Sequence, residues 1–236
     1  MPPLLSVLIP LAPGENSWRD LISDLESVGT CAEILFVVTT EERAHLEDEL
    51  AQLDLAPAVR TISAPPGRAA QLNAGASAAE GEFLLFLHAD SRVSATAWAA
   101  LLNSLDRHPD RLHYFNLRFQ TDGPRWMPLN AWGVWFRSHW FKLPFGDQGL
   151  CLKAEQFRQI GPFDESVPYG EDHVFVWTAR IHGMRLRCTG ASIETSARKY
   201  RDHGWLRTTL RHLWLTIRQA VPNWWRLVRR RWGGRV

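Results

Sequence analysis

The sequence predicts an α/β domain with a mostly parallel central sheet flanked by helices, followed by a C-terminal helical tail. Three observations lead to this fold class. Short runs of β-branched residues alternate with segments whose apolar residues recur at helical spacing. One run, residues 83–87, is apolar throughout, as in a strand that is buried on both faces. From Ser196 onward the chain is basic and carries apolar residues at helical spacing.

The first sixty residues alternate strands with helices. Residues 6–10 and 33–38 are predicted strands, and Ser17 is a plausible N-cap for the helix between them. Residues 41–53 predict a second helix and residues 58–62 a third strand. This alternation is typical of a parallel sheet.

A buried strand ends at a polar segment in the next part of the chain. The break Pro65-Pro66-Gly67 precedes a helix of small residues over 69–78, and residues 83–87 follow as the strand. The strand stops at His88 and Asp90. These polar groups should therefore lie at the carboxyl edge of the sheet, where open α/β folds bind ligands.

The second half is less regular. It predicts a helix over residues 95–105, strands at 112–119 and 150–152, and a helix that begins at Glu171. An aromatic segment separates the two strands. We therefore divide the chain into a domain over residues 1–195 and a basic, tryptophan-rich helical tail over 196–236.

Charge is distributed unevenly between these two parts. The tail holds eleven of the 27 Lys and Arg residues and one of the 25 acids, Asp202. Sixteen basic and 24 acidic residues remain, so the body carries about −8 and the tail +10. Such asymmetry indicates that the tail meets an anionic partner, either a membrane surface or a nucleic acid.

The cellular setting predicted from the sequence is the cytoplasm. The N-terminus lacks the basic segment and cleavage site of a secretory signal, and no apolar run approaches the ~20 residues that span a bilayer. Cys31, Cys151 and Cys188 are far apart and form no C-x-x-C pair. Neither a disulfide framework nor a structural zinc site is expected.

Three short segments carry residues suited to chemistry. Asp90 suits a hard divalent cation, because Mg²⁺ takes few carboxylates together with phosphate oxygens; a helix-capping role is the alternative. Arg68 and Asn73 belong to a helix start that could bind phosphate, although an ordinary packing helix has the same pattern. Glu171-Asp172 begins another helix, where one carboxylate could act as general base and first-turn acids are also common.

Together and in this order, the segments resemble an inverting family 2 glycosyltransferase of the GT-A fold, of a small bacterial single-domain subgroup. The resemblance runs from Ser6 to about Thr209. The matching segments are residues 6–10 (SVLIP), Glu15-Asn16, 67–75 (GRAAQLNAG), 86–91 (FLHADS), 145–149 (FGDQG), 161–164 (GPFD), Glu171-Asp172 and 195–200 (TSARKY).

The resemblance implies a role for each matching residue. The donor, a nucleotide sugar, would be bound by Pro10, Glu15, Arg68, Asn73 and Asp90, with Mg²⁺ or Mn²⁺ on Asp90. Asp147 and Gln148 would orient the acceptor. The second carboxylate of Glu171-Asp172 would be the catalytic base, which removes the proton of an acceptor hydroxyl.

Two positions depart from the family pattern. Where the family usually places an Asp that holds the base, this chain reads Val37-Val38-Thr39-Thr40-Glu41, so base recognition is altered, through Glu41 or backbone groups. His88 replaces a further Asp of the metal motif, which leaves Asp90 as its only carboxylate.

The tail contains two apolar stripes on either side of Pro222. Leu206, Leu210, Leu213 and Ile217 form the first, which we expect to pack on the domain. Val221, Trp225, Val228 and Trp232 form the second, with arginines largely on another face. The second stripe suits a membrane interface or a twin subunit. The membrane interpretation makes a lipid-linked acceptor a candidate.

Other functions remain open from the residues. A catalytically silent protein that binds nucleotide sugars or acts as a scaffold would keep the same fold. A nucleic-acid partner is disfavoured because no known motif accompanies the basic tail. A nucleotidyltransferase is disfavoured because Leu11-Ala12-Pro13-Gly14-Glu15 lacks the expected lysine.

Overall fold

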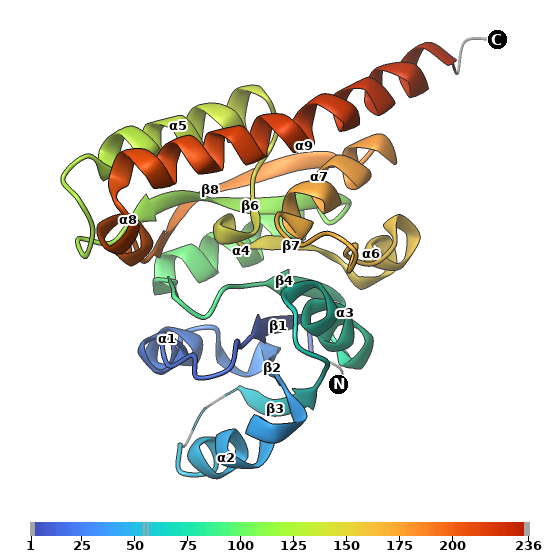
Figure 1. Ribbon diagram of the computed structural model, residues 1–236. Helices are drawn as coiled ribbons and strands as arrows, with labels where there is room; N and C mark the ends of the chain where they lie inside the picture. Colours follow the sequence, from blue (N-terminus) through green and yellow to red (C-terminus); the bar gives the residue numbers. More distant parts are fainter. Residues whose placement is uncertain (1–2, 54, 56, 234–236) are drawn as a thin grey trace.

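The computed structural model describes residues 3–53, 55 and 57–233, and in this part an eight-stranded mixed sheet is covered by helices (Figure 1). The strand order is β3-β2-β1-β4-β7-β6-β8-β5. Four strand pairs are parallel and three are antiparallel. The predicted fold class, a mostly parallel sheet with flanking helices, is confirmed.

The N-terminal half contributes four strands that are all parallel to one another. Its strands are β1 (Leu5–Pro10), β2 (Ala32–Val38), β3 (Ala58–Ser63) and β4 (Phe83–Phe86). The helices that connect them are α1 (Trp18–Glu26), α2 (Thr40–Leu50) and α3 (Arg68–Ala78), with a short 3-10 turn, η1 (Gly29–Cys31). Each of these strands and α helices was predicted from the sequence.

The second half adds antiparallel pairs to the sheet. Its strands are β5 (Ser91–Arg92), β6 (Arg111–Phe119), β7 (Leu150–Lys153) and β8 (Arg185–Thr195). Its helices are α4 (Ala95–Arg107), α5 (Met127–Trp140), η2 (Gly146–Gln148), α6 (Ala154–Ile160), α7 (Glu171–Ile181), α8 (Arg198–His203) and α9 (Trp205–Gly233). β7 lies antiparallel between β4 and β6. The sequence did not predict β5, β8 or α6.

Both faces of the sheet are buried. Leu5, Val7 and Ile9 belong to one apolar cluster with residues of α1 and α4, whereas Leu8, between them, belongs to the cluster on the other face with α3 and α7. Successive side chains of a strand point to opposite faces. This alternation explains why the central strands read as continuous apolar runs.

One local expectation is corrected by the structure, and one segment without a prediction gains an element. Ser17 stands at the predicted N-cap of α1 but makes no capping hydrogen bond, because its hydroxyl donates to Glu15 Oε1 instead (2.6 Å). The aromatic segment forms a regular helix, α5.

The tail helix α9 differs from its prediction in its packing. It is one continuous helix that includes Pro222. The first stripe was expected to pack on the domain, but Leu206, Leu210, Leu213 and Ile217 are each more than half exposed. Thr208, Asn223 and Leu227 are buried instead. The side chain of Trp232 lies outside the described residues.

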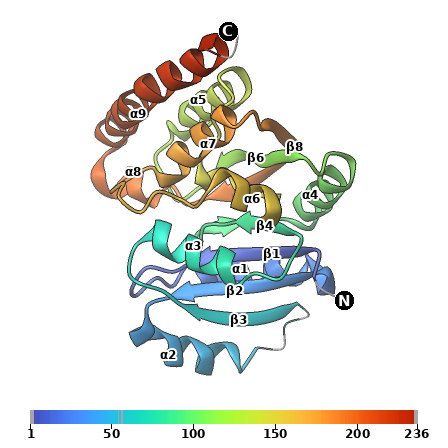
Figure 2. The same cartoon turned by 90° about the vertical axis from the view of Figure 1, so that its right-hand side faces the viewer.

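Figures 1 and 2 show α9 beside α5, over the sheet half that contains β6 and β8. Asn130 joins the two helices, since its side chain accepts from Trp205 Nε1 (2.6 Å) and donates to Thr209 Oγ1 (3.0 Å). In the described part of the chain, no helix combines the length and hydropathy needed to cross a membrane.

Gly81 provides a test of the sheet packing. A Cβ atom there would lie 2.7 Å from the backbone nitrogen of Ser6 and 2.9 Å from the carbonyl carbon of Leu5, so Gly81→Ala should displace β1. We expect a loss of about 1 to 3 kcal/mol in the free energy of unfolding, measured by urea denaturation. Gly133→Ala in α5 is the control: a Cβ there meets nothing within 4 Å, and the substitution should stabilise slightly. Equal effects of the two substitutions would contradict this account.

Candidate active site

The candidate site forms where β4 and β7 end side by side. Phe86 of β4 pairs with Leu150 of β7, and the two strands run antiparallel. The segment after β4, with His88 and Asp90, therefore lies next to η2, the segment before β7. The strand register thus brings together two motifs that are more than fifty residues apart in the sequence.

Gly146 is the point where three segments meet. A Cβ atom on Gly146 would lie 2.9 Å from Asp172 Oδ2 and 3.0 Å from His88 Nε2. The N–H of Gly146 donates to Asp172 Oδ2, and the N–H of His173 donates to Asp172 Oδ1 (2.8 Å). These two bonds hold the Asp172 carboxylate in one orientation, close to His88.

Asp90 and Asp147 are the carboxylates most affected by burial. Burial raises the pKa of Asp90, although the positive charges of Lys199 and Arg68 oppose the shift. Burial likewise raises the pKa of Asp147 to about 6; the Arg137 guanidinium opposes this, and Asp172 and Asp90 add to it. Asp147 Oδ1 is buried and has no hydrogen-bond partner among the described residues. The site therefore has capacity for a further cation or proton donor.

Arg68 and Glu171 form a charged pair at the starts of α3 and α7. Arg68 Nε lies 3.7 Å from Glu171 Oε1, and the Arg68 side chain is 45% exposed. Burial raises the pKa of Glu171, the negative charge of Asp172 adds to this, and Arg68 opposes it. Arg68 therefore pairs with a buried carboxylate, is partly exposed to solvent and acts electrostatically on Asp90.

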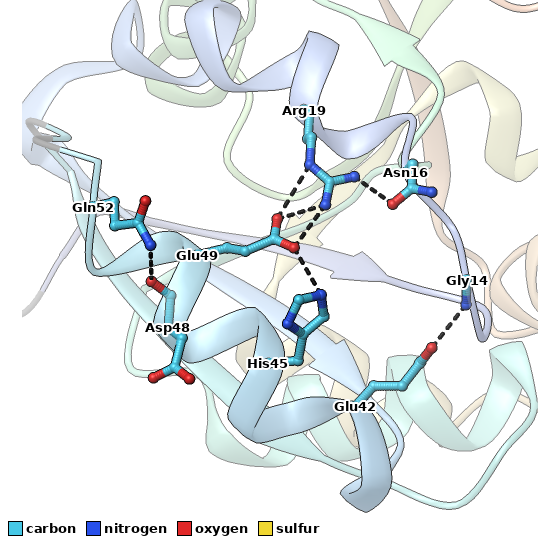
Figure 3. A network of polar contacts seen from close by, with 8 residues as sticks. All are labelled: Gly14, Asn16, Arg19, Glu42, His45, Asp48, Glu49 and Gln52. Atoms are coloured by element: carbon cyan, nitrogen blue, oxygen red, sulfur yellow. Dashed lines mark hydrogen bonds and ion pairs between the residues drawn. The ribbon is translucent and has the colours of Figure 1, made fainter.

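The loop after β1 carries Glu15 and is tied to α2. The N–H of Gly14 donates to Glu42 Oε1 (2.7 Å), and Arg19 Nε donates to Glu49 Oε2 (3.1 Å) (Figure 3). Glu42, and not the neighbouring Glu41, makes the contact with this loop. Burial alone would raise the pKa of Glu15, but hydrogen bonds from Ser17 and the charge of Arg198 hold it below its usual value. Glu15 also contributes to the electrostatics of Asp90.

Three of the predicted binding residues make their hydrogen bonds or packing contacts within the protein. The Asn73 side chain donates to the Phe163 carbonyl (3.0 Å) and accepts from the Phe163 N–H (2.9 Å). Gln148 donates to the Phe115 carbonyl (2.9 Å) and accepts from Ser138 (2.8 Å). Pro10 ends β1 in the core. Their direct contacts with donor or acceptor stay predictions, whereas the structure shows that they support the loops of the site.

Sequence reasoning missed three cations of the site. Arg137 of α5 acts on Asp147 and Asp172 and donates to Gln148 Oε1 (3.2 Å). Lys199 acts on Asp90 and His88, and Arg198 acts on Glu15. Arg198 and Lys199 lie beyond residue 195, the predicted end of the domain. The TSARKY segment was a signal for them, while Arg137 lies in the aromatic segment, whose pattern indicated no site.

The comparison with protein families decides the identity. The family described as Glycosyl transferase family 2 matches residues 33–162 of the 236, which is more than half of the chain. The chain belongs to glycosyltransferase family 2. The match covers Arg68, Asp90 and Asp147 but ends before Asp172, so it does not test the predicted base. The comparison with curated proteins found no match.

Solved structures show that this family 2 glycosyltransferase has the GT-A fold. A mannosyltransferase from Pyrobaculum calidifontis with GDP-Man and Mn²⁺ is 19% identical, with a TM-score of 0.67, over 94% of this chain and 65% of that one. Residues 1–349 of TarS from S. aureus with UDP-GlcNAc are 17% identical, with a TM-score of 0.59, over 81% of this chain and 58% of that one. GalNAc-T7 with UDP, GalNAc and Mn²⁺ is 14% identical, with a TM-score of 0.57, over 83% of this chain and 44% of that one. The alignment thus spans about half to two thirds of these chains.

The raised pKa of Asp147 predicts a pH dependence of stability in metal-free buffer. Because the folded pKa of about 6 lies above that of the unfolded chain, this carboxyl contributes stability that is full below about pH 4 and is lost as the pH rises through 6. Asp147→Asn removes this loss. Relative to the wild type, the variant should gain about 1 to 3 kcal/mol in the free energy of unfolding between pH 4 and pH 8. Urea denaturation at the two pH values measures it, with exposed Asp106→Asn as the control, which should show no such gain.

Proposed function

We propose that the protein transfers a sugar from a nucleotide-sugar donor to an acceptor hydroxyl, with inversion at the anomeric carbon. The single observation that carries the proposal is the meeting of three carboxylates and three cations at the edge of the sheet. The carboxylates are Asp90, Asp147 and Asp172, and the cations are Arg68, Arg137 and Lys199. Family membership supports the reaction class. The nucleotide sugars in two structural neighbours, UDP-GlcNAc and GDP-Man, support the donor class.

In this proposal Asp172 is the general base. Its carboxylate is oriented by the N–H groups of Gly146 and His173. The acceptor hydroxyl gives its proton to Asp172 while its oxygen forms a bond to the anomeric carbon. The bond from that carbon to the diphosphate breaks on the opposite face, and the electron pair leaves with the diphosphate. Glu171 positions Arg68 rather than taking part in the proton transfer.

The leaving diphosphate needs positive charge, and the chain supplies it from two sides. Arg68 comes from the start of α3, and Arg198 and Lys199 come from α8. Electrostatic interactions link these residues to Asp90 and Glu15, so they surround the donor region. Fixed charges aimed at developing negative charge lower the barrier because they need no reorganisation during the reaction.

The donor set at Asp90 fits Mg²⁺ or Mn²⁺. Among the described residues, no three His, Cys, Asp or Glu side chains gather into a metal site. A single carboxylate suits these ions, however, since they also take phosphate oxygens of the substrate. Burial lowers the pKa of His88 well below its usual value, with help from Arg68, so the imidazole is neutral and adds no positive charge. When bound, the ion would neutralise the departing diphosphate.

Asp172→Asn tests the role of the base. We expect release of nucleoside diphosphate from nucleotide sugars to fall by a factor on the order of 10² to 10⁴, because a neutral amide cannot take the proton. Donor binding should remain, measured as an increase in melting temperature on adding nucleotide sugars with Mn²⁺. Asp106→Asn, at an exposed position of α4, is the control. Near-normal turnover of Asp172→Asn would reject this role. Donor binding without turnover by the wild type would favour a silent binding protein.

We also propose that the exposed side of α9 lies on the anionic cytoplasmic face of a membrane. α9 carries eight exposed large apolar side chains, and the sequence from Trp205 to the end contains eight arginines and no acid. Tryptophan and arginine together suit the interface, where aromatic rings sit among head groups and arginines meet anionic lipid. A homodimer through this side is the alternative that the test below separates.

Sedimentation with liposomes tests the membrane proposal. Substitution of Arg207, Arg226 and Arg229 by Gln should weaken partition onto anionic vesicles on the order of a hundredfold, since each basic residue contributes about 1 kcal/mol. A control with Arg43, Arg107 and Arg158 changed to Gln has the same net charge and should bind like the wild type. Equal weakening in both proteins, or no binding of the wild type, would argue against the membrane contact.

A further inference from the structure

A large apolar groove lies between α5 and α9. Its volume is about 1020 Å³. Leu129, Val134 and Trp140 line it from α5, and Leu213 and Ile217 line it from α9. Figures 1 and 2 show these two helices side by side over the same part of the sheet. The apolar residues of this groove have no role in the sugar-transfer chemistry described above.

Part of the groove lining belongs to the candidate active site. Arg137, Phe145 and Asp147 line the groove together with the apolar residues. The Arg137 guanidinium lies 3.2 Å from the centre of the Phe145 ring, and Asp147 Oδ1 is a buried acceptor without a partner among the described residues. A molecule in the groove can therefore place a polar end at Asp147 while the rest of it contacts apolar side chains.

The apolar side chains along the α9 wall remain exposed to solvent. Leu213 is 54% exposed, Ile217 53% and Trp225 54%. On α5, Leu129 is 55% and Trp140 68% exposed. Monomeric proteins rarely leave so many large apolar residues together on one surface unless the surface binds something. The hydrogen bonds of Asn130 already hold the two helices together, so the fold does not need the helices to pack closely along the groove.

We propose that this groove binds the hydrocarbon chain of a lipid acceptor, whose polar head group lies at Asp147 and Arg137. The inference rests on the proposed sugar transfer, because it assigns the acceptor of that reaction. A sugar acceptor would gain few hydrogen bonds from a wall of Leu, Ile, Val and Trp side chains, whereas an alkyl chain gains free energy from the area it buries there.

Charge favours a lipid over a second copy of the chain. The arginines of α9 flank the exposed apolar residues, and the described part of α9 contains no acid. A symmetric contact through this side would bring the arginines of two copies together, and like charges at an interface oppose association. Anionic lipid head groups would instead neutralise them, and long arginine side chains suit such a boundary.

Quenching of tryptophan fluorescence tests the proposal directly. Five tryptophans line the groove: Trp140, Trp177, Trp205, Trp224 and Trp225. Dodecyl maltoside with a dibrominated chain, added below its micelle concentration, should quench the full-length protein in a saturable manner. Leu213→Glu and Ile217→Glu should each weaken this binding by at least about tenfold, because the alkyl chain would then bury a carboxylate.

Leu210→Glu is the matched control. Leu210 lies on the same helix with the same exposure as Leu213, 54%, but does not line the groove. It should bind the brominated detergent like the wild type. Equal loss in Leu210→Glu and Leu213→Glu, or no saturable quenching of the wild type, would overturn the proposal. A wild-type dimer that dissociates on Leu213→Glu and shows no quenching would identify the groove as a subunit interface, which also overturns it.

Donor turnover separates this inference from the proposed function. Release of nucleoside diphosphate is measured on the wild type without a lipid, beside the quenching experiment. Normal turnover without saturable quenching would reject only the lipid groove. Saturable quenching without any turnover in the wild type would reject the sugar transfer and leave the groove as a lipid-binding site.

Discussion

The site depends on the absence of a side chain at Gly146. Insertion of β7 antiparallel between β4 and β6 brings the turn before β7 against the end of β4. At that place the N–H of Gly146 donates to Asp172, and a Cβ atom on Gly146 would lie 2.9 Å from Asp172 Oδ2 and 3.0 Å from His88 Nε2. Any other residue would have to separate the metal segment from the start of α7. The missing side chain at Gly146 therefore allows the three segments of the site to pack closely.

The charges of the site stabilise one another. Three carboxylates close together would repel, and burial adds to the free-energy cost of ionising them. Arg137 lies on one side of the group, with Arg68 and Lys199 on another, and each lowers the pKa of a neighbouring carboxyl. Burial in turn lowers the pKa of Arg137 to about 10, which Asp147 and Asp172 oppose. The cations would neutralise a negatively charged donor, and the carboxylates would bind a metal ion.

The positions of Asp90 and Asp172 could be predicted because each follows a strong local signal. Asp90 comes after a fully apolar strand, and Asp172 lies in the first turn of a helix that follows a glycine. Arg137 could not be predicted in this way, since its role depends on how α5 lies over the second half of the sheet. The side chains of Asn73 and Gln148 belong to matching motifs, but their use as internal hydrogen-bonding groups depends on partners ninety and thirty-three residues away.

The error on the first stripe of α9 has a similar physical cause. Helical periodicity shows which face is apolar, but it does not show what that face contacts. In the structure the domain holds α9 through Thr208, Asn223 and Leu227, together with Gln219, so a mixed face packs and the apolar face stays out. The suitability of the tail for a membrane interface could be predicted from its composition. The groove could not, because it depends on the position of α5 beside α9.

The groove wall and the candidate base share one mechanical connection. Gln219 of α9 donates to the Tyr169 carbonyl (2.5 Å), and its side chain fills the space where Gly170 would carry a Cβ. Trp177 Nε1 donates to His173 Nε2 (2.9 Å), so the neutral His173 carries its proton on Nδ1 and donates it to Gln219 Oε1 (2.9 Å). Burial lowers the pKa of His173, which favours this neutral form. These contacts lie on both sides of Asp172, so α9 helps to hold the segment that carries the candidate base.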